Sequence, residues 1–257
     1  MAENDYSSTL GKKIFFFHPS ALTCNEVIAE LIQEEFEVYV ITDQAKLRKA
    51  IKSYPGSIMF ANINEVLHES EWEELVGEIV RQKETTGTIV GVIASIDDEA
   101  LKQKYLKQYN VECGFTVVGS DLKTAVSQLT DMLNSVNAKG RRNYIRMVMD
   151  KETKIIVNIP MHGTFIDGVI KDLSVVGFSC SFAFDPGLTK NSVIGDIQFR
   201  LQGQLQKVEG IVFGTRMDGA EKIYVLLFSP RVGSDVSTMI RKYIQFNLQN
   251  RMDKELN

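Results

Sequence analysis

The chain is poor in the residues that build metal centres, disulfide frameworks and nucleophilic active sites. Its 257 residues include three cysteines, which are odd in number and far apart: Cys24, Cys113 and Cys180. The histidines are as few and as scattered: His18, His68 and His162. This distribution offers no Cys-x-x-Cys pair and no base beside a nucleophile. We therefore expect no metal site, no catalytic residues, no cofactor and no enzymatic activity.

Long apolar segments and an excess of basic residues are absent from the sequence as well. No apolar run approaches the roughly 20 residues that span a bilayer. Residues 1–8 lack a basic region followed by an apolar one, so they do not have the composition of a secretory signal. The formal net charge of −4 disfavours a protein that coats nucleic acid. We expect a cytoplasmic protein without membrane insertion and without direct binding to nucleic acid.

What the sequence does contain is two halves with different hydrophobic periodicity. In the first domain, residues 1–136, apolar runs of strand length alternate with helix-like segments, and the runs are residues 13–17, 38–41, 57–61, 88–94 and 113–118. This alternation predicts an α/β domain with a five-stranded parallel sheet covered by helices on both faces. Thr23 with Glu26, and Ser70 with Glu73, have the spacing of capping boxes. The acids of residues 97–99 are typical of a further helix start.

The order and spacing of these elements are similar to a response-regulator receiver domain, but the reactive positions differ. Receivers hold a metal with an acidic pair after the first strand, where this chain has His18 and Pro19. The phosphoacceptor position at the end of the third strand is occupied by Asn62, whose amide accepts no phosphoryl group. Ser95 stands at the hydroxyl position, and residues 116–120 lack the expected lysine. The resemblance implies a degenerate receiver-like domain without phosphotransfer.

In the second domain, residues 137–257, the periodicity changes to two. Strand-like segments occupy residues 154–159, 163–173, 176–184, 193–201, 205–213 and 223–228. Short turns at residues 202–204 and 217–220 favour antiparallel hairpins. A helix from about Ser234 follows. This pattern predicts a six-stranded antiparallel β-barrel with a terminal helix, and we interpret the phenylalanines of its strands as core: Phe178, Phe182, Phe199 and Phe213.

Two short motifs in this second half have the chemistry of an anion-binding site. Arg142-Asn-Tyr-Ile-Arg146 places two arginines four residues apart, directly after Arg141. Asp172-Leu-Ser174-Val-Val-Gly177 combines a carboxylate, a hydroxyl and a glycine in a short turn. Guanidinium groups bind phosphate or pair bidentately with guanine O6 and N7. The glycine permits close approach of the main chain.

The two motifs resemble those of the PilZ domain, a bacterial receptor module for cyclic di-GMP, whose pattern is RxxxR followed by [DN]xSxxG. Both halves are present in the expected order, and the resemblance extends from about Lys139 to the C-terminus. It implies cyclic di-GMP as the ligand, with the binding residues Arg141, Arg142, Arg146, Asp172, Ser174 and Gly177. In this family the residue before the first motif arginine, here Arg141, influences whether one or two stacked ligand molecules bind.

The sequence therefore favours a second-messenger receptor that controls motility, attachment or virulence. Binding at the interdomain linker is expected to alter the domain arrangement and the affinity for an unidentified protein partner. The alternative is a PilZ-type protein-interaction adaptor that does not bind the nucleotide. A barrel that binds RNA or DNA needs a basic, aromatic-rich strand face, and the strands have few basic residues beside their phenylalanines.

Overall fold

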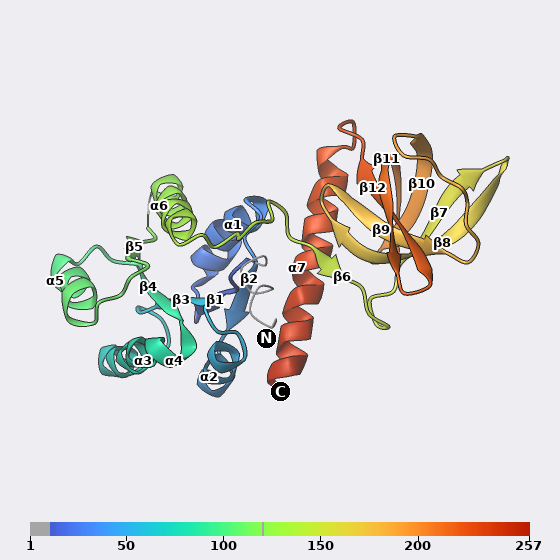
Figure 1. The fold of residues 1–257 in the computed structure, drawn as a ribbon. Coiled ribbons are helices and arrows are strands. Elements are labelled where there is room, and N and C mark those ends of the chain that lie inside the picture. Colours follow the sequence, from blue (N-terminus) through green and yellow to red (C-terminus); the bar gives the residue numbers. More distant parts are fainter. Residues whose placement is uncertain (1–10, 120) are drawn as a thin grey trace. The chain divides into compact units, whose positions relative to one another are not determined.

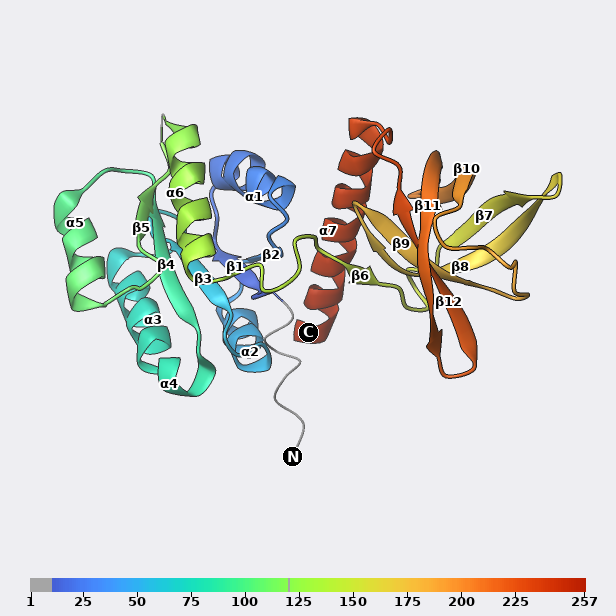
Figure 2. The ribbon, with the colours of Figure 1, turned by 45° about the horizontal axis from the view of Figure 1, so that its top comes forward.

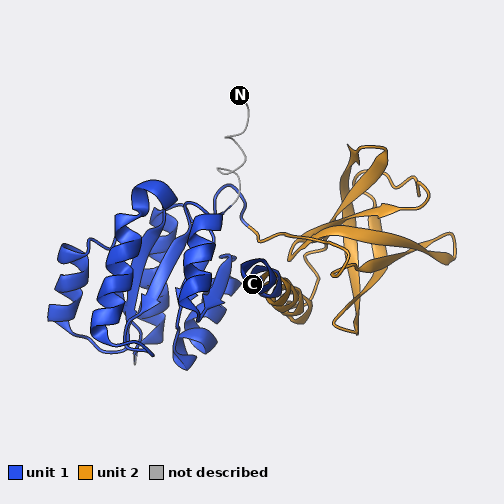
Figure 3. Cartoon of the chain, turned by 90° about the horizontal axis from the view of Figure 1, so that it is seen from below, with its two compact units in different colours: residues 1–143, 249–257 blue, residues 144–248 orange. Residues whose placement is uncertain are grey.

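The computed structural model describes residues 11–119 and 121–257 and contains two compact units (Figure 1). Unit 1 runs to Asn143 and also takes in Gln249–Asn257, whereas unit 2 comprises Tyr144–Leu248 (Figure 3). In the described residues, no helix is both long enough and apolar enough to cross a membrane.

Unit 1 is built on a five-stranded sheet in which every pair of neighbours is parallel. The strands are β1 (Ile14–Phe17), β2 (Val38–Ile41), β3 (Ile58–Asn62), β4 (Ile89–Ala94) and β5 (Phe115–Val117). Their order is β2-β1-β3-β4-β5, which is the flavodoxin-like order of doubly wound sheets. All residues of β1 and β3 are buried, as expected for strands covered on both faces. The predicted parallel sheet is confirmed.

Helices cover both faces of this sheet. They are η1 (Thr23–Ile28), α1 (Ala29–Gln33), α2 (Gln44–Ser53), α3 (Glu69–Arg81), α4 (Lys83–Thr86), α5 (Glu99–Gln103), η2 (Lys104–Gln108) and α6 (Leu122–Ser135). Leu31 of α1 and Leu129 of α6 share one apolar cluster with Phe16 and Phe60 of the sheet. Figure 2 shows α1 and α6 on one face and α2 and α3 on the other.

Two of the three predicted helix starts are wrong, and one is confirmed. At the helix that leads into η1, the Ser20 hydroxyl accepts a hydrogen bond from the Thr23 backbone N at 3.1 Å, so Ser20 and not Thr23 is the capping residue. The cap before α3 is His68, whose backbone N donates to Glu71 at 2.8 Å, so the box lies two residues earlier than predicted. Asp98 does cap α5, because its carboxylate accepts from the Leu101 N at 3.0 Å.

Unit 2 is a closed antiparallel barrel. Its strands are β7 (Ile156–Met161), β8 (Thr164–Ser174), β9 (Gly177–Phe182), β10 (Val193–Leu201), β11 (Gln204–Asp218) and β12 (Glu221–Phe228). They follow the order β8-β7-β10-β11-β12-β9, and pairing of β9 with β8 closes the ring. A short strand, β6 (Met147–Val148), pairs with β8 outside this ring. The barrel predicted from the sequence is confirmed, whereas β6 was not predicted.

The terminal helix α7 (Ser234–Leu256) contributes to both units. Ile240 and Ile244 are buried in the barrel cluster. In unit 1, the side-chain amide of Gln249 accepts from the Val40 N at 2.9 Å and donates to the Val40 O at 3.0 Å. Because β2 is an edge strand, this amide satisfies backbone groups that a neighbouring strand would otherwise pair.

We predict that Gln249→Ala accelerates hydrogen exchange of the Val40 amide and lowers stability by about 1 kcal/mol, since it removes both bonds to the strand edge. Exchange measured by NMR and urea unfolding test this. The control is Asn250→Ala at the neighbouring exposed position, which should leave both unchanged. Equal Val40 exchange in the two variants would contradict the proposed role of Gln249.

Candidate ligand-binding site

Pairing between β6 and β8 brings Arg146, the last residue of the RxxxR motif, next to the motif of residues 172–177. Met147 pairs with Leu173 and Val148 with Asp172 in antiparallel register. Arg146 immediately precedes β6, so continuation of this register places it at the Asp172–Ser174 end of β8. Residues that are 26 positions apart in the sequence thus become neighbours. The Arg146 Nε lies 3.5 Å from Asp172 Oδ1.

The Asp172 carboxylate is the centre of this cluster. Its side chain is only 11% exposed. The Ser179 hydroxyl of β9 donates a hydrogen bond to Oδ2, and Arg216 Nη2 of β11 lies 3.6 Å from the same oxygen. A buried carboxylate requires hydrogen bonds or opposite charges to offset its desolvation. Here one hydroxyl and two guanidinium groups supply both.

Ser174 and Gly177 shape the turn that joins β8 to β9. The Ser174 hydroxyl donates to the Gly177 carbonyl at 3.1 Å, and both residues are buried. A Cβ on Gly177 would lie 2.2 Å from the Leu226 carbonyl oxygen of β12. The glycine therefore permits the close approach of a neighbouring strand, and the motif serine holds the turn in place.

Arg141 and Arg142 lie in the segment between α6 and β6, and both are exposed. They belong to the end of unit 1, whereas Arg146 belongs to unit 2, so the boundary between units falls inside the RxxxR motif. Of the predicted ligand-binding residues, the structure brings together four within unit 2: Arg146, Asp172, Ser174 and Gly177.

Arg216 was missed by the sequence analysis, because it lies in neither motif. Its strand was expected to end at Phe213, but β11 continues to Asp218 after a bulge between Val212 and Gly214. Residues 214–218 have no alternation of apolar and polar side chains that would extend the strand, and residues 217–220 have the composition of a turn, so the sequence held no signal for Arg216. Only the pairing of β11, β12 and β9 places Arg216 near Asp172.

The nearby thiol of Cys180 takes no part in ionic chemistry. Burial, together with the negative charge of Asp172, raises the pKa of Cys180 to about 12. The side chain belongs to the barrel core. At neutral pH it is therefore a neutral apolar group that supports β9 from the inner side.

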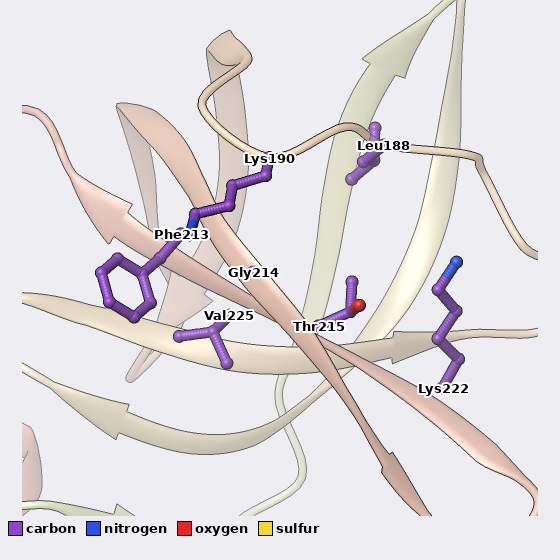
Figure 4. Close-up of a pocket in the computed structure, with 7 residues that line it drawn as sticks. All are labelled: Leu188, Lys190, Phe213, Gly214, Thr215, Lys222 and Val225. Carbon is purple, nitrogen blue, oxygen red and sulfur yellow. The ribbon is translucent and has the colours of Figure 1, made fainter.

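The barrel phenylalanines do not all lie in its core. Phe178 and Phe199 are buried, as predicted, but Phe213 at the β11 bulge is 59% exposed, so that part of the interpretation is wrong. Phe213 borders a cavity of about 530 Å³ whose other lining residues are Leu188, Lys190, Gly214, Thr215, Lys222 and Val225. Figure 4 shows Phe213 and Val225 on one side of this cavity and Lys222 on the other. The Lys190 Nζ lies 6.0 Å from the Phe213 ring centroid.

The carboxyl edge of the unit 1 sheet carries Asn62, Ser95 and His18, the residues that the sequence analysis compared with the reactive positions of receiver domains. Asn62 ends β3 and is buried, and its Oδ1 accepts from the Thr23 hydroxyl at 3.4 Å. The Ser95 backbone N donates to Asn64 at 2.8 Å. Burial lowers the pKa of His18, which favours its neutral form. Among the described residues, no group of His, Cys, Asp and Glu is placed to hold a metal ion.

The solved structures that are similar to this chain include PilZ-domain proteins. YcgR from Escherichia coli in complex with cyclic di-GMP is 15% identical, with a TM-score of 0.38, over 46% of this chain and 50% of YcgR. MrkH from K. pneumonia in complex with cyclic di-GMP is 16% identical, with a TM-score of 0.40, over 44% of this chain and 55% of MrkH. The Bacillus subtilis inhibitor of motility MotI is 16% identical, with a TM-score of 0.37, over 43% of this chain and 52% of MotI.

The matched region thus spans about half the length of these proteins. No family model and no curated protein sequence matches the chain.

We predict that Gly177→Ala destabilises unit 2 by more than about 2 kcal/mol, because the added methyl group overlaps the backbone of β12. Thermal unfolding measures this effect. Gly195→Ala in β10 is the matched control, since a Cβ there meets nothing within 4 Å. Similar melting temperatures for the two variants would refute the proposed packing role of Gly177.

Proposed function

We propose that this protein is a PilZ-type receptor for cyclic di-GMP. The observation that carries the proposal is the buried Asp172 carboxylate with the Arg146 and Arg216 guanidinium groups beside it. The Arg146 side chain is 41% exposed and the Arg216 side chain 49%, so a ligand can reach both guanidinium groups from solvent. Arg146 and Asp172 of this cluster belong to the two motifs that resemble those of the PilZ family.

The chemistry of the ligand suits this cluster. Cyclic di-GMP carries two phosphates and two guanines, so it needs cationic groups together with groups that read base edges. A guanidinium is planar and always charged, and it can contact either a phosphate or the O6 and N7 of guanine. By resemblance to the family, Arg142 and Arg146 take these roles, with Asp172, Ser174 and Gly177 on the opposing side. Arg141 is proposed to influence the number of ligand molecules bound.

The protein is proposed to act as a non-enzymatic effector. In this proposal a receiver-like domain of residues 1–136 is followed by a PilZ domain of residues 137–257. The RxxxR motif spans the boundary between the two compact units, so a ligand that orders Arg142 and Arg146 together acts on both sides of that boundary. We propose that binding changes the domain arrangement and thereby the affinity for a protein partner.

Calorimetric titration with cyclic di-GMP tests the ligand. We expect a dissociation constant in the micromolar range or below for the unaltered protein. Arg146→Ala and Asp172→Ala should weaken binding by about ten- to a hundredfold, because each removes charge-assisted contacts or the group that orients them. Circular dichroism of each variant verifies that it is folded.

The matched control is Arg200→Ala. Arg200 is an exposed arginine of the same barrel, and its Nη1 donates to the Gly203 carbonyl of its own hairpin. Unchanged affinity is expected for this variant. If the unaltered, folded protein shows no heat of binding, the receptor proposal is overturned.

Small-angle scattering tests the conformational part of the proposal. We expect the radius of gyration of the unaltered protein to change when saturating cyclic di-GMP is added. The Arg146→Ala protein at the same ligand concentration provides the control and should show a smaller change or none. Scattering curves that coincide with and without ligand would contradict the rearrangement and leave the binding proposal standing.

The second candidate is a protein-interaction adaptor that has no nucleotide ligand. It is favoured by the exposed aromatic side chains of unit 2, since Phe184 is 85% and Phe213 59% exposed. The same titration separates the two candidates. An adaptor shows no binding of cyclic di-GMP, and its partner is captured equally well with and without the nucleotide.

A further inference from the structure

A third arginine reaches the candidate site from a part of the barrel that neither motif includes. Arg216 lies near the end of β11, and its Nη2 is 3.6 Å from Asp172 Oδ2. Its side chain is 49% exposed. In sequence it is 44 residues beyond Asp172, so this approach is a product of the closed barrel.

Strand register explains why Arg216 faces the same side as Asp172. Arg216 pairs with Ile223 of β12, and Ile223 pairs with Ser181 of β9. Residues directly opposite one another in antiparallel strands project to the same face. Ser179 lies two residues before Ser181, hence on that face too, and it donates to Asp172. The intervening Cys180 and Tyr224 belong to the core, so this common face is the outer one.

The charges around Asp172 favour an anion. Asp172 together with Arg146 is formally neutral, and Arg216 makes the cluster of three positive by one unit. Both arginine–carboxylate distances, 3.5 and 3.6 Å, exceed the roughly 2.8 Å of a charge-assisted hydrogen bond. Within the described part of the chain, neither guanidinium donates a hydrogen bond. Their N–H groups are therefore available to a ligand that enters from the outer face.

We propose that Arg216 is a third ligand-binding arginine, which contacts a phosphate or a guanine edge of the bound nucleotide from the β11 side. The inference rests on the proposed function, and it assigns Asp172 a positioning role toward two guanidinium groups instead of one. The ligand surface then extends from the β8–β9 turn across β9 and β12 to β11. A site of this extent suits a ligand with two phosphates and two bases better than the motif residues alone.

The test uses substitutions that separate the guanidinium from its aliphatic stem. Ile223, the register partner of Arg216, is fully buried, and the stem of a long side chain can help to cover it. Arg216→Met keeps an apolar stem and removes the charged group, whereas Arg216→Lys keeps the charge and removes the planar fork. Arg200→Met is the matched control on an exposed arginine of β10.

In calorimetry with cyclic di-GMP, we expect the dissociation constant to rise about tenfold or more for Arg216→Met and by an intermediate factor for Arg216→Lys. Arg200→Met should bind like the unaltered protein, and melting temperatures of all variants should remain close to one another. If the unaltered protein binds and Arg216→Met binds equally well, the third-arginine inference is overturned while the receptor proposal stands. If the unaltered protein does not bind at all, both fall together.

Discussion

The candidate site depends on the Asp172 carboxylate, which lies on the outer face of the barrel but is largely shielded from water. A charge withdrawn from water must be offset by hydrogen bonds and opposite charges, or it destabilises the fold. Asp172 meets this requirement with the Ser179 hydroxyl and with the guanidinium groups of Arg146, just before β6, and Arg216 of β11. The arginines are held near one another by the carboxylate, although they repel each other. The buried negative charge of Asp172 therefore holds two guanidinium groups at the outer face of the barrel, where they give a net positive charge.

The arrangement is maintained by backbone features rather than by the charged groups themselves. The β6–β8 pairing sets the position of Arg146, and the tight approach of β12 to Gly177 sets the β8–β9 turn. Ser174 closes that turn from within. These contacts are a strand pairing, a close backbone approach and a hydrogen bond within a turn, and none of them involves a ligand. The exposed guanidinium groups are the parts left free to respond to one.

Periodicity predicted the elements of both units well, because burial on one or both faces leaves a direct pattern in the sequence. Local chemistry was less informative. Thr23 has the residue type of a cap, but it is buried and faces Asn62, while Ser20 caps the helix. Phe213 is an apolar residue of a type usually found in cores, but it lies at the bulge in β11 and its side chain is exposed. In each case a tertiary contact or a one-residue irregularity outweighed the local preference.

The sequence by itself determined the two periodicities, the parallel sheet, the closed barrel and the presence of both motifs. These features follow from residue type and spacing along one chain segment. Only the tertiary structure decided that Arg146 and Asp172 are neighbours, that Gly177 faces β12, and that Arg216 joins them from β11. Such contacts depend on strand register and barrel closure, which bring together residues too distant in sequence for any local pattern to reveal.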